Sequence, residues 1–389
     1  MDLIKAAYIH IPFCEHICHY CDFNKVFLQG QPVDEYLNSL KKEIELTLEA
    51  APTTHLDSIF VGGGTPTALN EKQLQFLCET INELLPYNQD TEFTFEANPG
   101  DLSKEKFQIL HDAGVNRLSF GVQTFNDELL KSIGRTHRAA DVFKSVELAK
   151  NTGFKNISVD LIYSLPGQTL DDFRETLETS FSLDINHYSG YSLIIEPKTV
   201  FYNLMRKGRL PLPGEDTEAA MYEVLMEEMA KHAFTQYEIS NFAQTGYESK
   251  HNLTYWNNDE YYGFGAGAHG YVSGRRRSNF GPLKKYMEPL QQGNLPILEE
   301  TIPTFAEQME EEMFLGLRKN KGVSVQRFID RYGKNPLDLF KNEMNELTEK
   351  DLIDVQHNQI MLTKKGRFLG NEVFQSFLGV VEDEDYNKV

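Results

Sequence analysis

The hydrophobic pattern of the chain alternates between short β-rich runs and longer runs with helical spacing, up to about residue 200. Strands and helices that alternate about six times are typical of a parallel sheet with its connecting helices outside. The sequence therefore predicts an α/β fold. In a barrel of this kind, chemistry sits at the carboxyl ends of the strands. The runs predicted to be strands are residues 6–11, 58–64, 92–98, 117–123, 156–166 and 188–195.

Between these runs, apolar residues recur every three or four positions, the spacing that places them on one face of an α-helix. Thr169 followed by Asp172 is typical of a capping box at the start of a further helix. Two helix faces are visible early in the chain: Leu37, Leu40, Ile44 and Leu48, and then Leu74, Leu77, Ile81 and Leu84.

Polar or glycine-rich residues stand at corresponding places on four predicted strands. "GGGTPT" follows the second strand, Glu96 lies at the end of the third, Gln123 ends the fourth, and Asp160 lies within the fifth. A single residue of this kind would carry little weight. Four at matching positions predict one site at the mouth of a barrel.

The pattern changes after about residue 240. Residues 246–282 are rich in glycine and aromatic residues and lack helical periodicity, and the segment is too long for an ordinary connection. From about residue 303 the pattern is helical, with a predicted hairpin at 352–363 and a helix at 364–378. We divide the chain into a barrel at 1–240, a linking region at 241–300 and a smaller C-terminal α+β unit at 301–389 that resembles a winged helix.

Composition and charge exclude several classes of protein. The net charge is −20, so phosphate backbones repel the chain, which argues against a general nucleic-acid binder and against radical-based RNA modification. No stretch approaches the roughly 18 apolar residues of a membrane-spanning helix. The N-terminus lacks the pattern of a secretory signal. The sequence therefore predicts a cytoplasmic protein with no nucleic-acid partner.

Three of the four cysteines lie close together in "CEHICHYC", directly after a predicted strand. The spacing of Cys14, Cys18 and Cys21 fits a loop wrapped around a metal centre. Zinc at a structural site normally takes four protein ligands, and a neighbouring histidine would have to supply the fourth. A 4Fe–4S cluster usually takes four cysteines, so three leave one iron open to a substrate. Three unrelated buried thiols are the remaining alternative.

The C-x-x-x-C-x-x-C motif from Cys14 to Cys21 resembles that of the radical S-adenosylmethionine (SAM) superfamily. This resemblance implies that Cys14, Cys18 and Cys21 hold three irons of a 4Fe–4S cluster. It also implies that the amino and carboxylate groups of SAM bind the fourth iron, and that an electron from the cluster can cleave SAM to a radical. The superfamily has a full or partial (β/α) barrel, which is consistent with the strand pattern.

Further motifs resemble the oxygen-independent coproporphyrinogen III oxidase family over most of residues 6–200. They are "VGGGTPT", "EANPGDL", "NRLSFGVQTFN", "GRTHRAAD" and "SVDLIYSLPGQT", in the family's order. The resemblance implies that Tyr8, Gly63 and Glu96 contact the cluster-bound SAM, and glycine would let the backbone approach it. An ion pair between Arg135 and Asp160 is the structural alternative for those two. The positions that match contacts to a second SAM are Tyr20, Gly64, Thr65, Gln123, Arg135 and Asp160.

Two features resemble the heme-chaperone branch of this family, the HemW type. The oxidases carry another cysteine two residues after the third, whereas this chain has Phe23, as that branch does. "HNLTYW" places His251, Asn252, Tyr255 and Trp256 in the pattern that the branch presents for heme. Imidazole is a normal axial ligand of heme iron, and aromatic rings suit a flat macrocycle. The alternative is a hydrogen-bonded His251 with Trp256 in the core.

Three other features are weaker. "GAGAHG" at 265–270 matches G-x-G-x-x-G, but no helix pattern follows it, so we do not predict a dinucleotide site. Cys78 lies at helical spacing between Leu74 and Ile81 and is predicted to be a small core residue. "RRR" at 275–277 is the most basic run, and pairing with heme propionates, an acidic partner or solvent are all open.

The resemblance therefore implies a heme chaperone that binds heme and transfers it to an acceptor protein, built on a radical SAM barrel. The cofactors it implies are a 4Fe–4S cluster, SAM and heme. The partners are an electron donor and a heme acceptor, membrane-associated or not, and a homodimer is compatible with the sequence. The alternative is a coproporphyrinogen III oxidase, which would decarboxylate two propionate side chains.

Overall fold

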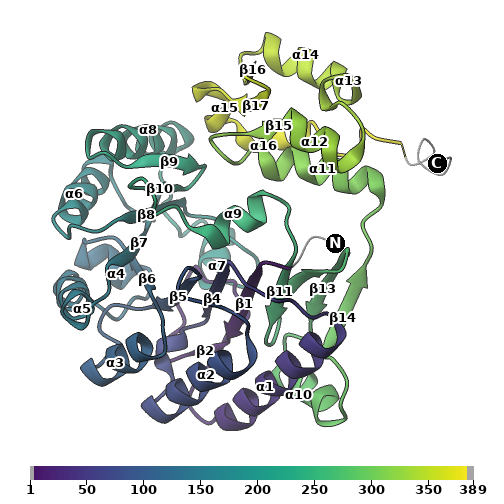
Figure 1. Cartoon of the computed structure of the whole chain (residues 1–389). Helices are drawn as coiled ribbons and strands as arrows, with labels where there is room; N and C mark the ends of the chain where they lie inside the picture. The colour runs from purple at the N-terminus through teal and green to yellow at the C-terminus, as the bar shows by residue number, and fades with distance from the viewer. Residues whose placement is uncertain (1–3, 383–389) are drawn as a thin grey trace.

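A twelve-stranded sheet forms the centre of the computed structural model, which describes residues 4–382. The strand order is β14-β13-β12-β11-β1-β4-β5-β6-β7-β8-β10-β9. The seven strands from β11 to β8 run parallel, and antiparallel strands extend the sheet on both sides. Because β14 and β9 remain at opposite ends of this order, the sheet is a partial (β/α) barrel (Figure 1), as the sequence predicts.

All six predicted strands are present. The largest differences in length are at the ends of β7 and β8, where the apolar pattern continues three residues beyond the strand. Parallel strands are covered on both faces, so they form nearly continuous apolar runs that are easy to recognise. The strands are β1 (Ala6–Ile11), β4 (Ser58–Gly63), β5 (Glu92–Ala97), β6 (Arg117–Gln123), β7 (Asn156–Tyr163) and β8 (His187–Ser192).

Helices cover the outer face of the parallel strands (Figure 1). The two predicted apolar faces lie on the first two helices and are largely buried. The predicted capping box is confirmed, since the Thr169 side chain accepts from the backbone N–H of Asp172. The barrel helices are α1 (Val33–Ala50), α2 (Glu71–Leu84), α3 (Lys104–Asp112), α4 (Asp127–Ser132), α5 (Ala139–Thr152), α6 (Leu170–Phe181), α7 (Val200–Arg206) and α8 (Glu215–Lys231), with a 3-10 turn at Pro66–Ala68.

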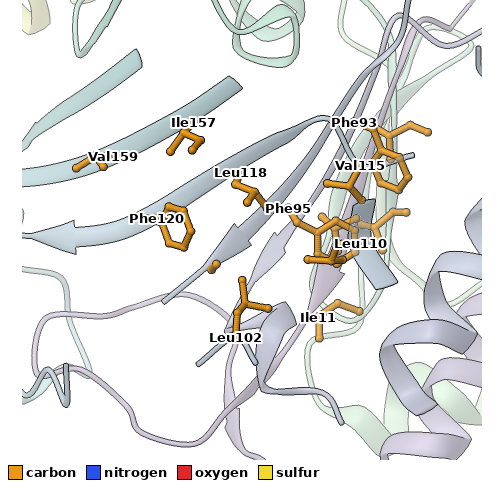
Figure 2. Close-up of a cluster of buried hydrophobic side chains, with 14 of the residues drawn as sticks. Ile11, Phe93, Phe95, Leu102, Leu110, Val115, Leu118, Phe120, Ile157 and Val159 are labelled. Carbon is orange, nitrogen blue, oxygen red and sulfur yellow. The ribbon is translucent and has the colours of Figure 1, made fainter. Parts of the chain in front are cut away.

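The main hydrophobic core lies between the sheet and these helices. Phe93 and Phe95 of β5 and Leu118 and Phe120 of β6 point to the helix side with Leu110 of α3, and all five are fully buried (Figure 2). Removing a phenylalanine ring from such a site costs about 3–5 kcal/mol. Because side chains alternate along a strand, the intervening residues point into the barrel, and these include predicted site residues.

Residues 235–301 are more regular than the sequence indicates. The glycine-rich segment 246–282, for which the sequence showed no helical periodicity, contains one short helix and three strands. Its elements are only four to seven residues long, which is too short to show a period. The elements are β9 (Thr235–Glu238), β10 (Asn241–Ala243), α9 (Lys250–Trp256), β11 (Tyr261–Phe264), β12 (His269–Val272), β13 (Arg275–Asn279), α10 (Leu283–Gln291) and β14 (Ile297–Thr301).

The C-terminal unit has a separate core, which includes Met313, Phe328, Phe340 and Ile360. The predicted hairpin is confirmed. The single predicted helix at 364–378 is wrong, because two short helices meet at Leu369, where two low-propensity glycines flank the junction. The elements are α11 (Phe305–Gly316), β15 (Val323–Ser324), α12 (Val325–Tyr332), α13 (Pro336–Leu339), α14 (Lys341–Glu349), β16 (Ile353–Gln356), β17 (Gln359–Leu362), α15 (Lys364–Phe368) and α16 (Gly370–Gln375).

Among residues 4–382, no helix combines the length and the apolar character needed to cross a membrane. The predicted domain boundaries at 240 and 300 stay predictions, and β11 to β14 belong to the same sheet as the barrel strands.

Candidate cluster and SAM site

The three clustered cysteines lie in a loop that leaves the carboxyl end of β1. The loop begins with β2 (Phe13–Cys14) and returns through β3 (Val26–Phe27), which pairs with β2 in parallel. Backbone bonds from Val26 N to Pro12 O and from Leu28 N to Cys14 O, both 2.8 Å, close its base. Cys14 is buried, whereas Cys18 and Cys21 are half-buried. The loop therefore presents its thiols at the mouth of the barrel.

Burial keeps the thiols of Cys14 and Cys21 protonated. Burial raises the pKa of Cys14 to about 11, and the neighbouring Cys21 and Cys18 raise it further, against a hydrogen bond from Thr65 that lowers it. Burial also raises the pKa of Cys21. The three sulfurs are thus close enough to affect one another. A metal centre must displace these protons to bind, because the thiolate is the ligand.

The arrangement of the three cysteines is compatible with a cluster. Within residues 4–382, no three His, Cys, Asp or Glu side chains surround one point as a single metal ion requires. A 4Fe–4S cluster spreads its cysteines over separate irons, so they need only face a common space. Gly64 borders that space, because a Cβ at residue 64 would lie 3.0 Å from Cys14 Sγ and 2.8 Å from the Pro12 carbonyl carbon.

The glycine-rich turn after β4 packs against the loop. Gly63 has φ +119°, a conformation that favours glycine, and a Cβ there would lie 2.6 Å from the His10 ring. Thr65 Oγ1 lies 3.6 Å from Cys14 Sγ and accepts a bond from Asn98 Nδ2 at 3.1 Å. The turn thus brings two predicted SAM residues, Gly64 and Thr65, beside the first cysteine.

Glu96 is a half-buried residue inside the barrel, near the end of β5. Its Oε2 accepts a hydrogen bond from Gly63 N at 3.0 Å. Burial raises the pKa of Glu96 to about 8, and the negative charge of Asp160 raises it further. The carboxyl is therefore largely protonated at neutral pH. It would ionise more readily beside a cation such as an ammonium group.

The remaining predicted SAM residues gather at neighbouring strand ends. Arg135 donates to Cys18 Sγ at 3.4 Å and to the Gly121 carbonyl. Gln123 ends β6 with φ +70°, an uncommon conformation for a non-glycine residue. Ser119 donates to Asp160 at 3.2 Å, and Arg135 and Asp160 form no ion pair within residues 4–382.

Tyr8 and Tyr20 approach the site from two sides. The Tyr8 hydroxyl is hydrogen-bonded to His10 Nδ1 at 2.9 Å, inside the barrel. The Tyr20 ring packs against the small apolar cluster around Leu130, beside the cysteine loop. Burial raises the pKa of Tyr20, while the Arg135 charge lowers it. Tyr20 and Arg135 are therefore neighbours, as a shared ligand site requires.

A small cleft opens beside the cysteine loop. Three of its lining residues, Asn98, Asp101 and His137, were not predicted as site residues. All three stand inside motifs that carry the family resemblance, "EANPGDL" and "GRTHRAAD", so a signal for them was present. The cleft is lined by Glu15, His16, Cys18, Asn98, Asp101, Gly134, Arg135, Thr136 and His137.

The predicted heme residues lie elsewhere, on helix α9 at the opposite end of the strands. Glu92, the first residue of β5, accepts from Ser249 Oγ at 3.0 Å and from the backbone N–H groups of Lys250 and His251 at 3.0 and 3.1 Å. A carboxylate at a helix N-terminus satisfies free N–H groups and complements the helix dipole. Glu92 therefore fixes α9 at the floor of the barrel.

His251 is buried, at 2% exposure, with both ring nitrogens engaged. Nδ1 is hydrogen-bonded to Ser58 Oγ at 3.0 Å and Nε2 to Tyr255 Oη at 2.8 Å. The ring stacks on Phe60 with centroids 5.0 Å apart. Burial lowers the pKa of His251 to about 3, and the Arg117 charge lowers it further, so the ring is neutral. His251 thus has the hydrogen-bonded arrangement that the sequence left open as an alternative.

The other residues of this motif face the C-terminal unit or the barrel floor. The Arg318 guanidinium lies 4.6 Å from the Trp256 ring centroid, and the indole Nε1 is buried without a hydrogen-bond partner within residues 4–382. Asn252 Nδ2 lies 3.5 Å from Tyr237 Oη. Figure 1 shows α9 between the sheet and the C-terminal unit. The motif therefore connects the two parts of the protein.

The basic run at 275–277 is already paired. Arg275 and Arg277 share Glu300 at 2.8 and 2.6 Å, and Arg276 pairs with Glu311 at 2.5 Å. Each guanidinium thus has a carboxylate partner in the protein, which makes this run a weaker candidate for binding propionates.

The structure thus brings the predicted cluster and SAM residues together but holds the predicted heme residues apart from them. The six-residue strand β4 runs from Ser58, which contacts His251, to Gly63, which contacts Glu96. At about 3.3 Å per residue, the two ends are roughly 17 Å apart. Tyr8 lies between them, with its ring centroid 6.4 Å from that of His251.

Sequence comparison identifies two regions of known type. Residues 8–179 match the sequence model of the radical SAM superfamily, and residues 304–369 match that of the HemN C-terminal domain. The fold resembles the solved structure of coproporphyrinogen III oxidase (HemN) from Escherichia coli, a radical SAM enzyme. The TM-score is 0.85 at 24% identity, covering 98% of this chain and 91% of that one.

Several relatives named heme chaperone HemW match most of the chain. The chain is 57% identical to heme chaperone HemW of Bacillus subtilis over 97% of this chain and 100% of the relative. It is 47% identical to heme chaperone HemW of Lactococcus lactis over 96% of this chain and 97% of that relative. It is 38% identical to heme chaperone HemW of Escherichia coli over 69% of this chain and 70% of that relative. The chain therefore belongs to the heme chaperone HemW family of radical SAM proteins.

Proposed function

We propose that this protein binds heme and transfers it to an acceptor protein, on a barrel that also holds a 4Fe–4S cluster and SAM. The observation that carries the proposal is the full-length similarity to proteins named heme chaperone HemW, at 57% and 47% identity. Similarity over the whole length covers the barrel, α9 and the C-terminal unit alike. The relative that shares only the fold, at 24% identity, is the oxidase.

Phe23 supports the chaperone over the oxidase. It stands where the oxidase motif has a further cysteine, and its ring is 65% exposed at the mouth of the barrel. A phenyl ring cannot ligate a metal or carry a thiol's redox chemistry. The oxidase chemistry would therefore have to proceed without that cysteine.

In this proposal the residues at the mouth hold the cofactors. Cys14, Cys18 and Cys21 bind the cluster, and with SAM bound the cluster supplies one-electron chemistry. Gly64 keeps the space beside Cys14 open, and Glu96 offers a carboxyl to the ammonium group of SAM. That ammonium group would favour the ionised form of Glu96, whose pKa is raised by desolvation to about 8.

Heme contact through α9 requires a local rearrangement. Nε2 of His251 is bonded to Tyr255 and Nδ1 to Ser58, so neither nitrogen is free to bind iron. Ligation through Nε2 would require that Tyr255 turns away. The other residues of the motif, Asn252 and Trp256, are half-buried and would follow that movement.

The test uses one anaerobically reconstituted preparation for three assays: heme titration, heme transfer to an apo-globin, and conversion of coproporphyrinogen. We expect heme binding and transfer, without conversion. His251→Ala should lower heme affinity while iron and sulfide contents stay unchanged. His269→Ala is the matched control, since His269 is exposed on β12 and lies outside the motif. Robust decarboxylation by the wild-type protein would overturn the proposal.

A further inference from the structure

The G-A-G-A-H-G segment at 265–270, which we do not predict to be a dinucleotide site, lies directly against the cysteine loop. Asn24 stands three residues after Cys21. Its Nδ2 donates to the Ala266 carbonyl at 2.7 Å and to the Gly281 carbonyl at 3.1 Å. These bonds join positions 242 and 257 residues apart in the chain. One amide group therefore ties the cysteine loop to both ends of the β12–β13 hairpin.

The turn that receives Asn24 requires glycine. Gly267 has φ +75°, and a Cβ there would lie 2.8 Å from Asn24 Nδ2. Gly265 has φ +102°, and a Cβ there would lie 2.5 Å from the His10 carbonyl oxygen. Glycine is therefore favoured at both positions for two reasons: the backbone has a positive φ, and neighbouring atoms lie too close for a Cβ. The approach is to the cysteine loop and to β1, not to a phosphate group.

The turn is itself held from behind by a buried carboxyl. Glu43 of α1 is 2% exposed and accepts from Gly265 N at 2.8 Å, from Asn279 Nδ2 at 2.5 Å and from Tyr286 Oη at 2.5 Å. The Tyr36 hydroxyl donates to the His10 carbonyl at 2.6 Å and accepts from Ala266 N at 3.1 Å. The 265–267 turn that Asn24 contacts is therefore held in place by hydrogen bonds of its own.

Asn24 also connects to the barrel interior. His10 Nε2 is hydrogen-bonded to the Asn24 carbonyl at 2.7 Å, and His10 Nδ1 to Tyr8 Oη at 2.9 Å. A carbonyl only accepts, so Nε2 carries the proton and Nδ1 accepts from the Tyr8 hydroxyl. A continuous line of hydrogen bonds thus runs from Tyr8 through His10 and Asn24 to the 265–267 turn.

We propose that Asn24 is a positioning residue that clamps the cysteine loop onto the 265–267 turn and, through His10, onto Tyr8. The clamp fixes the thiols relative to the strand whose Tyr8 faces the SAM site. The clamp therefore concerns how the cluster and SAM are held, and not how heme is bound. The proposal therefore goes beyond heme handling and does not depend on it.

Two variants test the hydrogen bonds themselves. Asn24→Ala removes both donors, and Asn24→Asp keeps the shape but directs carboxylate oxygens at two carbonyls. In the metal-free protein, the clamp predicts that iodoacetamide modifies Cys18 and Cys21 on the order of tenfold faster in either variant, since about two hydrogen bonds hold the loop. In the reconstituted protein, SAM should no longer shift the electron paramagnetic resonance spectrum of the reduced cluster as in the wild type.

A second pair of variants approaches the clamp from the other side. Gly267→Ala places a methyl group against Asn24 and should reproduce the Asn24→Ala result. Gly274→Ala is its matched control, because Gly274 has a similar φ of +72° with nothing within 4 Å of its Cβ position. Asn38→Ala is the control for Asn24, since Asn38 is exposed on α1 and bonds only within that helix.

The outcomes separate the clamp from general destabilisation. If Asn24→Asp behaves like the wild type, packing rather than hydrogen bonding holds the loop and the proposal fails. It also fails if Gly267→Ala and Gly274→Ala are equal in thiol modification. Should Asn24→Ala not fold, Gly267→Ala decides the question. None of these measurements uses heme, so loss of heme binding would refute the proposed function without touching the clamp.

Discussion

The cysteine loop at the mouth of the barrel and helix α9 at its floor use polar groups in opposite ways. At the mouth, Cys18 and Cys21 remain half-buried, and Cys18 lines a cleft. At the floor, His251 has both nitrogens satisfied by Ser58 and Tyr255. The first arrangement leaves binding capacity for a ligand. In the second arrangement, the hydrogen-bonding groups of His251 are already used within the protein. The motif therefore stabilises the fold, and an internal hydrogen bond must break before His251 can bind a ligand.

The largest effect that would test this comparison is loss of the cluster. Cys14→Ser, Cys18→Ser and Cys21→Ser should each abolish the visible thiolate–iron absorption of the reconstituted protein, because each removes one of three protein ligands. Cys78→Ala is the control, since Cys78 is buried on α2, away from the loop. A triple variant that retains iron and sulfide would refute the ligand assignment at the mouth.

The next effect is at the floor. Glu92→Ala should lower the free energy of unfolding by about 3 kcal/mol, because it leaves the Ser249 hydroxyl and two N–H groups of α9 without an acceptor. Urea denaturation of the metal-free protein measures this change. Glu49→Ala, an exposed position of α1, should change stability by less than about 0.5 kcal/mol. Equal effects would mean that α9 is not held by Glu92.

The two ends should also respond to pH in opposite directions. Burial raises the pKa of Glu96 from 4.5 to about 8, so its contribution to stability is full at low pH and is lost as pH rises toward 8. Burial lowers the pKa of His251 from 6.5 to about 3, so its contribution is full above 6.5 and is lost as pH falls toward 3.

The free energy of unfolding of the metal-free protein, measured as a function of pH, separates these two contributions. Glu96→Gln should flatten the loss of stability as pH rises from 4.5 toward 8 and leave the loss on the acid side, as pH falls below 6.5, unchanged. His251→Gln should flatten only the acid side. A variant that flattens both sides equally would show that the two groups are coupled, and the comparison of two independent ends would be wrong.

The smallest effect concerns the bond that closes the floor. Tyr255→Phe removes the partner of His251 Nε2 and should cost about 1–2 kcal/mol in urea denaturation. In the proposed function it should also raise heme affinity, since Nε2 becomes free. Tyr247→Phe is the control, because the Tyr247 hydroxyl makes no hydrogen bond within residues 4–382. Unchanged heme affinity in Tyr255→Phe would argue against ligation through Nε2.

Much of the barrel and its mouth could be predicted from local patterns. The six strands, the faces of α1 and α2 and the Thr169 capping box each depend on residues close in sequence. The segment 246–282 could not be predicted in the same way, since α9 has only seven residues and its N-terminal partner, Glu92, lies far back in the chain. Asn98 and His137 stand within recognised motifs, but the motifs do not by themselves show that these two side chains line the cleft beside the cysteine loop.

The alternation of strands and helices, the cysteine spacing and the family resemblance can all be read from the sequence, because periodicity and motif spacing are properties of neighbouring residues. The folded chain is needed to show that β11 lies beside β1, that Asn24 reaches Ala266 and that His251 contacts Ser58. Ser58 and His251 are 193 positions apart in the sequence, and Asn24 and Ala266 are 242 positions apart. The residues next to a polar side chain in the sequence do not show which distant group will be its hydrogen-bond partner. That partner is set only when folding buries the side chain and it must form a hydrogen bond.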